Sequence, residues 1–299
     1  MNRATAAALS IGAAGTACLA WGLAEAHAFT TRRVTVPVLA PGQASLRVLH
    51  VSDLHLTPRQ RDKIAWAASL AQEQPDLVVV TGDNLAHPDA VPAVAEALAG
   101  VLSAPGVFVF GSNDYFAPHL KNPLGYFAGP SKAFQQQVRL PTERLRSVFL
   151  DAGWYDLNNA RALLDIGGVA VSAVGMDDPH LGRDRMPAPD GRGHGTLHLG
   201  VVHAPYLRAL RALKADGSDL ILAGHTHGGQ VCVPGYGALV TNCDLDRRRA
   251  KGLSTWPGEA LGPDDAWLHV SAGAGTSPFA PVRFACRPEA TLLTLTARE

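Results

Sequence analysis

Short apolar segments alternate with two alanine-rich segments early in the chain, and apolar segments predominate after that. The alanine-rich segments, residues 63–74 and 91–102, have the composition and spacing of helices. The short segments are rich in Val, Leu and Ile, which predicts strands. They lie at residues 34–39, 46–51, 77–80, 107–110, 169–174, 197–202, 219–223, 266–270 and 290–295. The order of these segments predicts an α/β fold.

Carboxylate and imidazole side chains follow three of the predicted strands directly. Asp53 and His55 follow residues 46–51, Asp83 follows residues 77–80, and His225 and His227 follow residues 219–223. The carboxyl ends of neighbouring parallel strands meet at one edge of a sheet, which is where ligands bind in open α/β sheets. We therefore expect these five side chains to converge.

The spacing of further polar residues extends this set. Asp53, Asp83 and Asn113 are roughly thirty residues apart, about the length of one strand–helix–strand unit, and His203 follows the strand at 197–202. The complete set can supply two metal ions if Asp83 bridges them. We expect the first ion to bind Asp53, His55, Asp83 and His227, and the second to bind Asp83, Asn113, His203 and His225.

Five ordered motifs carry a resemblance to a known family. They are Asp53-Leu54-His55, Gly82-Asp83, residues 111–114, the single His203, and Gly224-His225-Thr226-His227. In this order they resemble the signature of the calcineurin-like metallophosphoesterases, and the resemblance covers nearly everything from about residue 46 onward. Within that superfamily the chain is similar to a bacterial branch that has an N-terminal membrane segment. Further stretches similar to that branch are Asn158-Asn159, residues 177–180, and residues 273–277 through 287–289.

One motif departs from the family pattern. Where the family has Gly-Asn-His-Asp, residues 111–114 read Gly-Ser-Asn-Asp. Two interpretations follow: either Asn113 supplies its amide oxygen to the second ion, or Ser112 or a water fills that position and Asn113 faces the substrate. We favour the first, because a neutral hydroxyl is a poor metal ligand. Under both, the imidazole that the family resemblance assigns to the leaving group is missing, and Asp114 is a candidate proton source through water.

The predicted chemistry is hydrolysis of a phosphodiester, phosphomonoester or pyrophosphate by a metal-activated hydroxide. Imidazole and oxygen ligands without thiolate suit two divalent ions among manganese, iron, zinc, nickel and cobalt, without choosing between them. Loss of a general acid lowers a rate by about 10²- to 10⁴-fold, so activity should be weakened. The alternative is a degenerate family member that binds metal and a phosphorylated ligand without turnover.

Composition and the resemblance together bound the architecture. The chain has 299 residues, zero formal net charge and 47% hydrophobic residues, enough for one large domain. A balanced charge offers no support for a nucleic-acid partner. The predicted chemistry implies a phosphate-containing small molecule or lipid-like substrate. The family resemblance implies a four-layer α/β/β/α sandwich of two mixed sheets. We predict an N-terminal segment (1–30), a linker and leading strand (31–44) and the metallophosphoesterase domain (45–299).

The first residues form an uncharged stretch from Ala4 to Ala24. As a helix it would span about 32 Å at about 1.5 Å per residue, close to the hydrocarbon thickness of about 30 Å. We predict a single retained membrane anchor with the catalytic domain on the extracytoplasmic side. The alternative is a secretory signal cleaved near Ala26-His27-Ala28. Arg3 on one side and Arg32-Arg33 on the other leave the orientation open.

Two remaining features concern the surroundings of the site. Residues 115–146 are rich in Pro, Gly and aromatic side chains, and we expect either a partly helical flap over the metals or an ordinary surface excursion. The aromatic residues that would recognise the substrate are Tyr115, Phe116, Tyr126 and Phe127. The histidines inside apolar runs, at positions 50, 198 and 269, are interpreted as packed strand residues.

Overall fold

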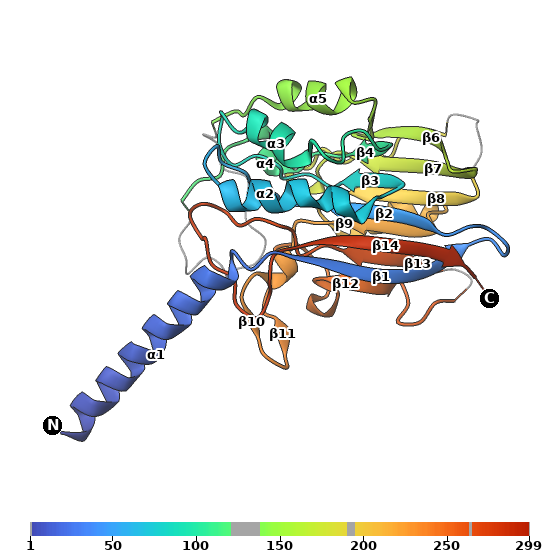
Figure 1. Cartoon of the computed structure of the whole chain (residues 1–299). Coiled ribbons are helices and arrows are strands. Elements are labelled where there is room, and N and C mark those ends of the chain that lie inside the picture. The colour runs from blue at the N-terminus through green and yellow to red at the C-terminus, as the bar shows by residue number, and fades with distance from the viewer. Residues whose placement is uncertain (1, 121–137, 190–194, 263–264, 299) are drawn as a thin grey trace.

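Two six-stranded sheets form the body of the molecule (Figure 1). Helices pack on the outer face of each sheet. The computed structural model describes residues 2–120, 138–189, 195–262 and 265–298. The helices are α1 (Arg3–Glu25), α2 (Arg61–Ser69), α3 (Val91–Leu98), α4 (Ser112–Tyr115), α5 (Thr142–Asp151) and α6 (Leu207–Ala215).

The first sheet has the strand order β1-β14-β2-β3-β4-β5. Its strands β2 to β5 run parallel, and β14 pairs antiparallel with β2 and parallel with β1. The bounds are β1 (Thr30–Leu39), β2 (Leu46–Val51), β3 (Leu77–Val80), β4 (Gly106–Phe108), β5 (Tyr155–Asp156) and β14 (Glu289–Ala297).

The second sheet has the order β12-β13-β9-β8-β7-β6. Its four central strands are parallel, and both edge strands are antiparallel to their neighbours. The bounds are β6 (Ala160–Ile166), β7 (Val169–Met176), β8 (Leu197–Val202), β9 (Leu220–Ala223), β12 (Gly252–Trp256) and β13 (Ala266–Val270). A separate pair, β10 (Cys232–Val233) with β11 (Gly237–Ala238), forms a small hairpin.

Three apolar cores hold the layers together. The central core lies between the sheets, where side chains such as Val48 and Val79 of the first sheet meet Val201 and Leu222 of the second. A second core packs the first sheet against α2, α3 and α5. The third packs the second sheet against α6. The fold is therefore the predicted α/β/β/α sandwich with mixed sheets, and both sheets are apolar on two faces, as buried sheets with parallel strands are.

The predicted elements agree closely with these bounds where the apolar runs are continuous. Strands β2, β3, β8 and β13 begin and end at the predicted residues. Among the elements that the pattern did not reveal, β6, β12, α5 and α6 carry apolar residues interrupted by polar ones. In β6 the side chains of Ala162, Leu164 and Ile166 are buried while Leu163 and Asp165 are exposed, because this edge strand presents one face to solvent.

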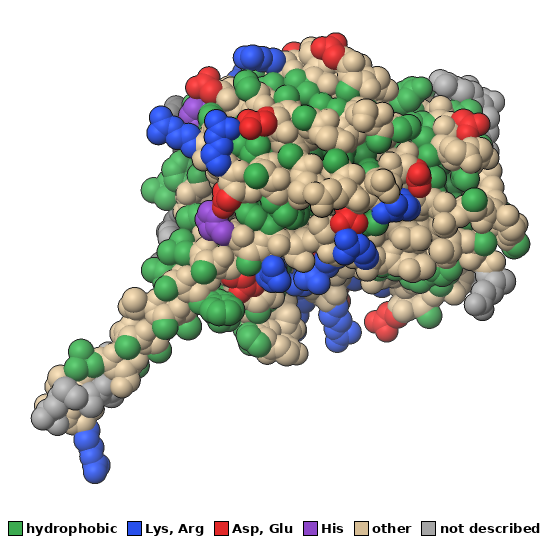
Figure 2. Space-filling view, viewed as in Figure 1, with side chains coloured by type: hydrophobic (Ala, Val, Ile, Leu, Met, Phe, Trp, Pro, Cys, Tyr) green, Lys and Arg blue, Asp and Glu red, His purple; other side chains and the backbone are tan. Residues whose placement is uncertain are grey.

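Helix α1 projects from the body of the molecule, and Figure 2 shows hydrophobic side chains along it. Large exposed apolar residues on this helix include Leu9, Ile11, Leu19 and Trp21. Within the described residues, none of the helices combines the length and the apolar content that crossing a membrane requires. The predicted membrane-spanning anchor is therefore not supported, since α1 consists largely of Ala, Gly, Ser and Thr.

The last turn of α1 is attached to the body by hydrogen bonds. The Glu25 carboxylate accepts from the backbone N–H of Ala285 at 3.1 Å and of Cys286 at 2.6 Å, and from the Trp21 ring at 2.7 Å. Glu25 is buried. The helix thus ends on the loop before β14.

The predicted flap is described only in part. Tyr126 and Phe127 lie outside the described residues. Tyr115 is buried at the end of α4, and its hydroxyl donates to Asp177 at 2.8 Å. Phe116 pairs with Arg139 in an isolated bridge and packs against the core beneath α2, α3 and α5. In the part that is described, both aromatic side chains serve packing.

Candidate metal centre

The predicted ligands leave their strands through a sharp backbone turn. Asp53, His55, Asp83, His225 and His227 all have positive φ, between 43° and 69°. Ten non-glycine residues of the described chain have a positive φ, and these five are half of them. A positive φ costs a non-glycine residue on the order of 1–3 kcal/mol, and such strain collects at functional sites. The turn directs each side chain off the strand end toward one shared region.

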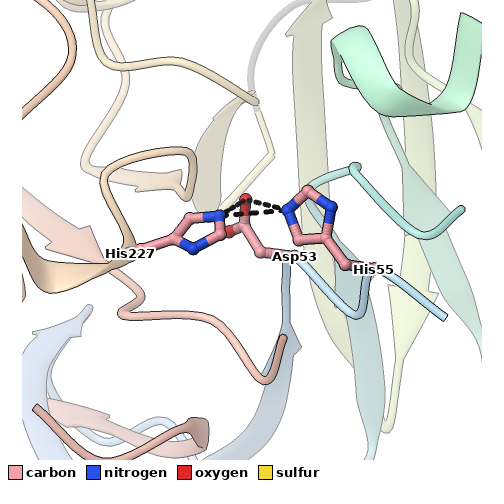
Figure 3. Close-up of side chains that lie close together, drawn as sticks. All are labelled: Asp53, His55 and His227. Carbon is pink, nitrogen blue, oxygen red and sulfur yellow. Dashed lines mark hydrogen bonds and ion pairs between the residues drawn. The ribbon is translucent and has the colours of Figure 1, made fainter. Parts of the chain in front are cut away.

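Asp53, His55 and His227 form the first group of converging ligand atoms (Figure 3). The two imidazole Nε2 atoms lie 3.0 Å apart. The Asp53 Oδ1 atom lies 3.4 Å from Nε2 of His227 and 4.0 Å from Nε2 of His55. Ligands about 2.1 Å from a common ion in tetrahedral geometry are about 3.4 Å from one another. The observed spacing therefore fits one divalent ion.

Asp53, Asp83 and His203 form a second group that shares Asp53 with the first. Asp83 Oδ2 lies 3.5 Å from Nε2 of His203 and 3.5 Å from Nε2 of His55. Its carboxylate therefore faces an imidazole from each side. The buried Nε2 of His203 has no hydrogen-bond partner in the described chain, and an unpartnered buried nitrogen beside two carboxylates fits a metal ligand.

His225 lies next to the second group without being part of either one. Its ring meets that of His203 edge to face, with the centroids 5.2 Å apart. Its backbone N–H donates to both oxygens of Asp53, at 3.0 and 3.2 Å. The structure therefore brings His225 to the edge of the centre, while the side chains that converge most closely are Asp53, His55, Asp83, His203 and His227.

Hydrogen bonds outside the groups orient two of the rings. His203 donates from Nδ1 to the carbonyl of Thr81 at 2.6 Å, which directs Nε2 toward Asp83. His225 donates from Nε2 to the carbonyl of Asn242 at 3.2 Å, which leaves Nδ1 as its candidate ligand atom. Such partners determine which nitrogen of a metal-binding histidine carries the lone pair.

Burial and mutual contact perturb the charges of the ligands. Burial alone would raise the pKa of Asp83, but the facing His203 holds it well below its usual range. Burial alone would lower the pKa of His203, but Asp83 raises it well above the ordinary value. The pKa of His55 is lowered to about 3, mainly by burial. Without metal, the centre is therefore held by a His203–Asp83 ion pair.

Two glycines of the motifs allow the backbone to approach the ligands. A Cβ at Gly111 would lie 2.3 Å from Oδ1 of Asp83 and 2.6 Å from Nε2 of His203. A Cβ at Gly224 would lie 1.9 Å from the Ser52 hydroxyl and 2.5 Å from Oδ2 of Asp53. Both motif glycines are thus required by space rather than by an unusual φ.

The altered motif places its residues around Asp83. The Asn113 amide donates to Asp83 Oδ2 at 2.8 Å, and its backbone N–H donates to Oδ1 at 2.7 Å. Asp114 is fully buried and accepts from the backbone N–H of Asp83, Asn84 and Gly111 at 2.8–3.0 Å. Burial, with the charge of Asp83, raises the pKa of Asp114 to about 7. Its contacts are those of a residue that holds two loops together.

A buried guanidinium that sequence reasoning missed supports the loop of His227. Arg283 is fully buried and donates to the backbone carbonyls of His227, Ala272, Gly273, Gly275 and Cys286 at 2.6–3.4 Å. The segment that it holds in turn packs on Asp53, whose carbonyl accepts from Gly275 N–H at 2.6 Å. No local pattern distinguishes this arginine from surface arginines.

A second group, whose approach to the site the sequence left open, lies beside His225. The ring of His180 packs against that of His225 with centroids 4.8 Å apart, and its Nδ1 lies 3.1 Å from the Tyr206 hydroxyl. Asp178 is fully buried, and burial raises its pKa to about 7. The sequence feature that pointed to these residues was the motif at residues 177–180, which the family resemblance included without assigning it a role.

Comparisons with known proteins agree with this geometry. Residues 46–229 match the family described as Calcineurin-like phosphoesterase. The chain is 28% identical over 261 residues to the uncharacterized metallophosphoesterase YkoQ of Bacillus subtilis (strain 168), covering 84% of each chain. It is 27% identical over 264 residues to the phosphodiesterase YaeI of Escherichia coli (strain K12), covering 84% of this chain and 83% of the relative.

Among solved structures, the chain is similar to the 5'-nucleotidase precursor from Thermus thermophilus. The two are 14% identical with a TM-score of 0.44, and the match covers 84% of this chain and 55% of that one. The family match spans more than half of the sequence, and its range includes all the predicted ligands from Asp53 to His227. The chain therefore belongs to the calcineurin-like phosphoesterase family, and it is a metal-dependent phosphoesterase.

Proposed function

We propose that the protein hydrolyses a phosphodiester or a pyrophosphate at a centre of two divalent metal ions. The observation that carries the proposal is the position of Asp83, whose Oδ2 lies 3.5 Å from both His55 and His203. Because those two imidazoles belong to different groups, one carboxylate at that place can serve both ions.

The first ion would be held by Asp53, His55, His227 and the shared Asp83, and the second by Asp83, Asn113, His203 and His225. When bound, two divalent ions lower the pKa of a coordinated water from about 15.7 to about 7 and neutralise the charge of the phosphoryl oxygens. Two groups of converging side chains support this assignment best. They are Asp53 with His55 and His227, and Asp53 with Asp83 and His203.

Asn113 supports the second ion position through its place beside Asp83. A carboxylate only accepts hydrogen bonds, so the amide nitrogen of Asn113 faces Asp83 and its amide oxygen is directed away. To serve as a ligand of the second ion, the amide would have to turn its oxygen toward the side that its nitrogen now occupies. We assign Asp114 to positioning this loop, since both of its oxygens already accept backbone N–H groups.

The altered motif also restricts the substrate. Asn113 cannot protonate a leaving group, so substrates whose leaving group departs as a stable anion are favoured. Pyrophosphates and aryl-like esters meet this condition, whereas alkyl monoesters do not. The name of the relative YaeI, a phosphodiesterase, supports a diester substrate.

The test is hydrolysis of bis(p-nitrophenyl) phosphate by the purified protein with manganese, zinc or nickel. We expect metal-dependent turnover that disappears in an Asp83→Ala variant and persists in an Asp89→Ala variant. Asp89 is the matched control because its side chain is 84% exposed and pairs only with His87 among the described residues. Turnover that Asp83→Ala leaves unchanged would contradict the proposed centre.

The alternative of metal and phospholigand binding without turnover predicts a different result. It is favoured by the Gly-Ser-Asn-Asp sequence at residues 111–114, which lacks the family's imidazole. In that case the protein would bind two equivalents of metal in a calorimetric titration and still fail to hydrolyse either the aryl diester or a nucleoside diphosphate sugar.

A further inference from the structure

A continuous series of hydrogen bonds runs between the two sheets and ends on a predicted metal ligand. It begins at His269 in β13, continues to His50 in β2 and to Thr81 after β3, and ends through Ser52 on Asp53. All five side chains are at most 1% exposed. The series thus connects the second sheet to the proposed first ion position through the buried interior.

Each link has the length of a good hydrogen bond. His269 Nδ1 lies 2.9 Å from His50 Nδ1, and His50 Nε2 lies 2.9 Å from the Thr81 hydroxyl. The Thr81 hydroxyl lies 2.6 Å from the Ser52 hydroxyl, which lies 2.6 Å from Oδ2 of Asp53. No link requires a water.

The carboxylate at the end sets the direction of the hydroxyl bonds. An ionised carboxylate only accepts, so Ser52 must donate its one hydroxyl proton to Asp53. Ser52 can then only accept from Thr81, which uses the one proton of Thr81. The Thr81 hydroxyl must therefore accept a hydrogen bond from the Nε2–H of His50.

The same reasoning determines the tautomers of both histidines. Burial holds the pKa of His50 well below its ordinary value and lowers that of His269 to about 4, so both rings are neutral at pH 7. A neutral His50 that carries its proton on Nε2 has a bare Nδ1. His269 must therefore donate to it from its own Nδ1. Only one arrangement of protons satisfies every link.

We propose that His269, His50, Thr81 and Ser52 form a one-way donor relay that positions the Asp53 carboxylate for metal binding. The relay holds Oδ2, while Oδ1 is the oxygen nearest to His227 and His55. The four residues act through Asp53 and are positioning residues. The proposal rests on the metal centre of the proposed function.

Thr81 also contacts His203, which belongs to the proposed second ion position. Its hydroxyl belongs to the relay, and its backbone carbonyl accepts from Nδ1 of His203 at 2.6 Å. A substitution that removes only the hydroxyl therefore separates the two effects. Thr81→Val removes it with little change of shape, and Thr81→Ser keeps it.

The chain offers a matched control next to the relay. Thr291 in β14 is also fully buried and pairs with His50 across the strands. Its hydroxyl has no hydrogen-bond partner within the described part of the chain. Thr291→Val therefore deletes a buried hydroxyl at the same depth without breaking the relay.

The first experiment is a calorimetric titration of the metal-free variants with Mn²⁺. Loss of a hydrogen-bond partner behind a metal ligand typically lowers metal affinity about 10- to 100-fold. We expect that loss for the proposed first ion position in Thr81→Val, and affinities within about threefold of the wild type for Thr81→Ser and Thr291→Val. Equal losses in Thr81→Val and Thr291→Val would assign the effect to packing and overturn the proposal.

The second experiment needs no substitution. In ¹⁵N-histidine spectra of the metal-free wild-type protein, His50 should be protonated on Nε2 and His269 on Nδ1 at pH 7. The opposite tautomer of His50 would reverse the direction of the series and overturn the relay. Neither measurement uses turnover, so a protein that binds metal with these tautomers but does not hydrolyse phosphate esters would refute the proposed function alone.

Discussion

The two proposed ion positions lie on either side of Asp83, whose carboxylate faces His55 and His203, but they differ in how their other ligands are held. On the side of Asp53, His55 and His227 the family motifs are complete, and Arg283 fixes the loop from behind. On the side of His203 the motif at residues 111–114 has changed, and Asn113 lies against Asp83 instead of an imidazole. Under the proposed function, the first side would serve metal binding, while the second would combine metal binding with an altered approach to the substrate.

This difference predicts that ligand supply and acid catalysis can change separately. The proposed metal ligands come from several strand ends, so one altered loop leaves most of them in place. Protonation of the leaving group depends on one side chain in that loop. A change at residues 112–113 therefore affects which substrates are hydrolysed more than whether metal is bound.

The largest effect is expected where the two positions meet. Asp83→Ala should abolish metal-dependent hydrolysis and reduce binding at both positions, because its Oδ2 faces His55 and His203 alike. His227→Ala should weaken one position only, since its Nε2 contacts only the first group. Metal stoichiometry from calorimetry measures both. Loss of one equivalent in each variant would show that Asp83 is not shared.

Restoring the family motif tests the altered side directly. The double variant Ser112→Asn with Asn113→His should raise hydrolysis of an alkyl phosphate ester by about 10²-fold, the lower end of the contribution of a general acid. Hydrolysis of the p-nitrophenyl diester should change little, because its leaving group needs no proton. Steady-state kcat/KM for both substrates measures this. A parallel rise with both would mean that the variant improves metal binding instead.

Asp114 should stabilise the folded protein through the loop at the proposed second ion position. Asp114→Ala leaves three buried backbone N–H groups without their acceptor, and an unsatisfied buried group costs about 1–3 kcal/mol. We expect a lower Tm and weaker binding at the second position than at the first. The exposed Asp89→Ala variant serves as the control. An unchanged Tm would contradict the loop-holding role.

The smallest effect is a dependence on pH that distinguishes the two positions. Asp83 raises the pKa of His203, so His203 is protonated at pH 7 without metal, whereas the pKa of His55 is lowered to about 3. Metal binding should therefore displace one proton from the second position, and its affinity should fall about tenfold per pH unit below the raised pKa. Titrations in buffers of different ionisation enthalpy measure that proton. Affinity independent of pH down to about 4 would contradict the assignment.

The same ion pair should make the free energy of unfolding of the metal-free protein depend on pH. The raised pKa of His203 means that its contribution is fully present below about 6.5 and is lost as pH rises through the raised value. The lowered pKa of Asp83 means that its contribution is present above about 3.9 and is lost as pH falls through the lowered value. In the metal-free wild-type protein, the free energy of unfolding should thus decline as the pH rises above neutrality. In the metal-free His203→Gln variant, this decline should be smaller.

The pattern of the sequence by itself predicted an α/β fold and the convergence of its strand ends, while the four-layer sandwich was what the family resemblance implied. Continuous apolar runs identified β2, β3, β8 and β13 to the residue, because a strand buried on both faces needs apolar side chains throughout. Polar residues that follow such runs lie near the carboxyl edge of the sheet. The repetition of carboxylates and imidazoles at several of these strand ends is what named Asp53, His55, Asp83, His203 and His227.

Only the tertiary structure decided the residues that act from behind the ligands. His50 and His269 are 219 positions apart, and as sequence they are two polar residues within apolar runs, which is why they were interpreted as packing. Arg283 and His180 likewise acquire their roles from elements distant along the chain. Hydrogen-bond direction and charge pairing depend on where side chains meet in space, and no local periodicity records that meeting.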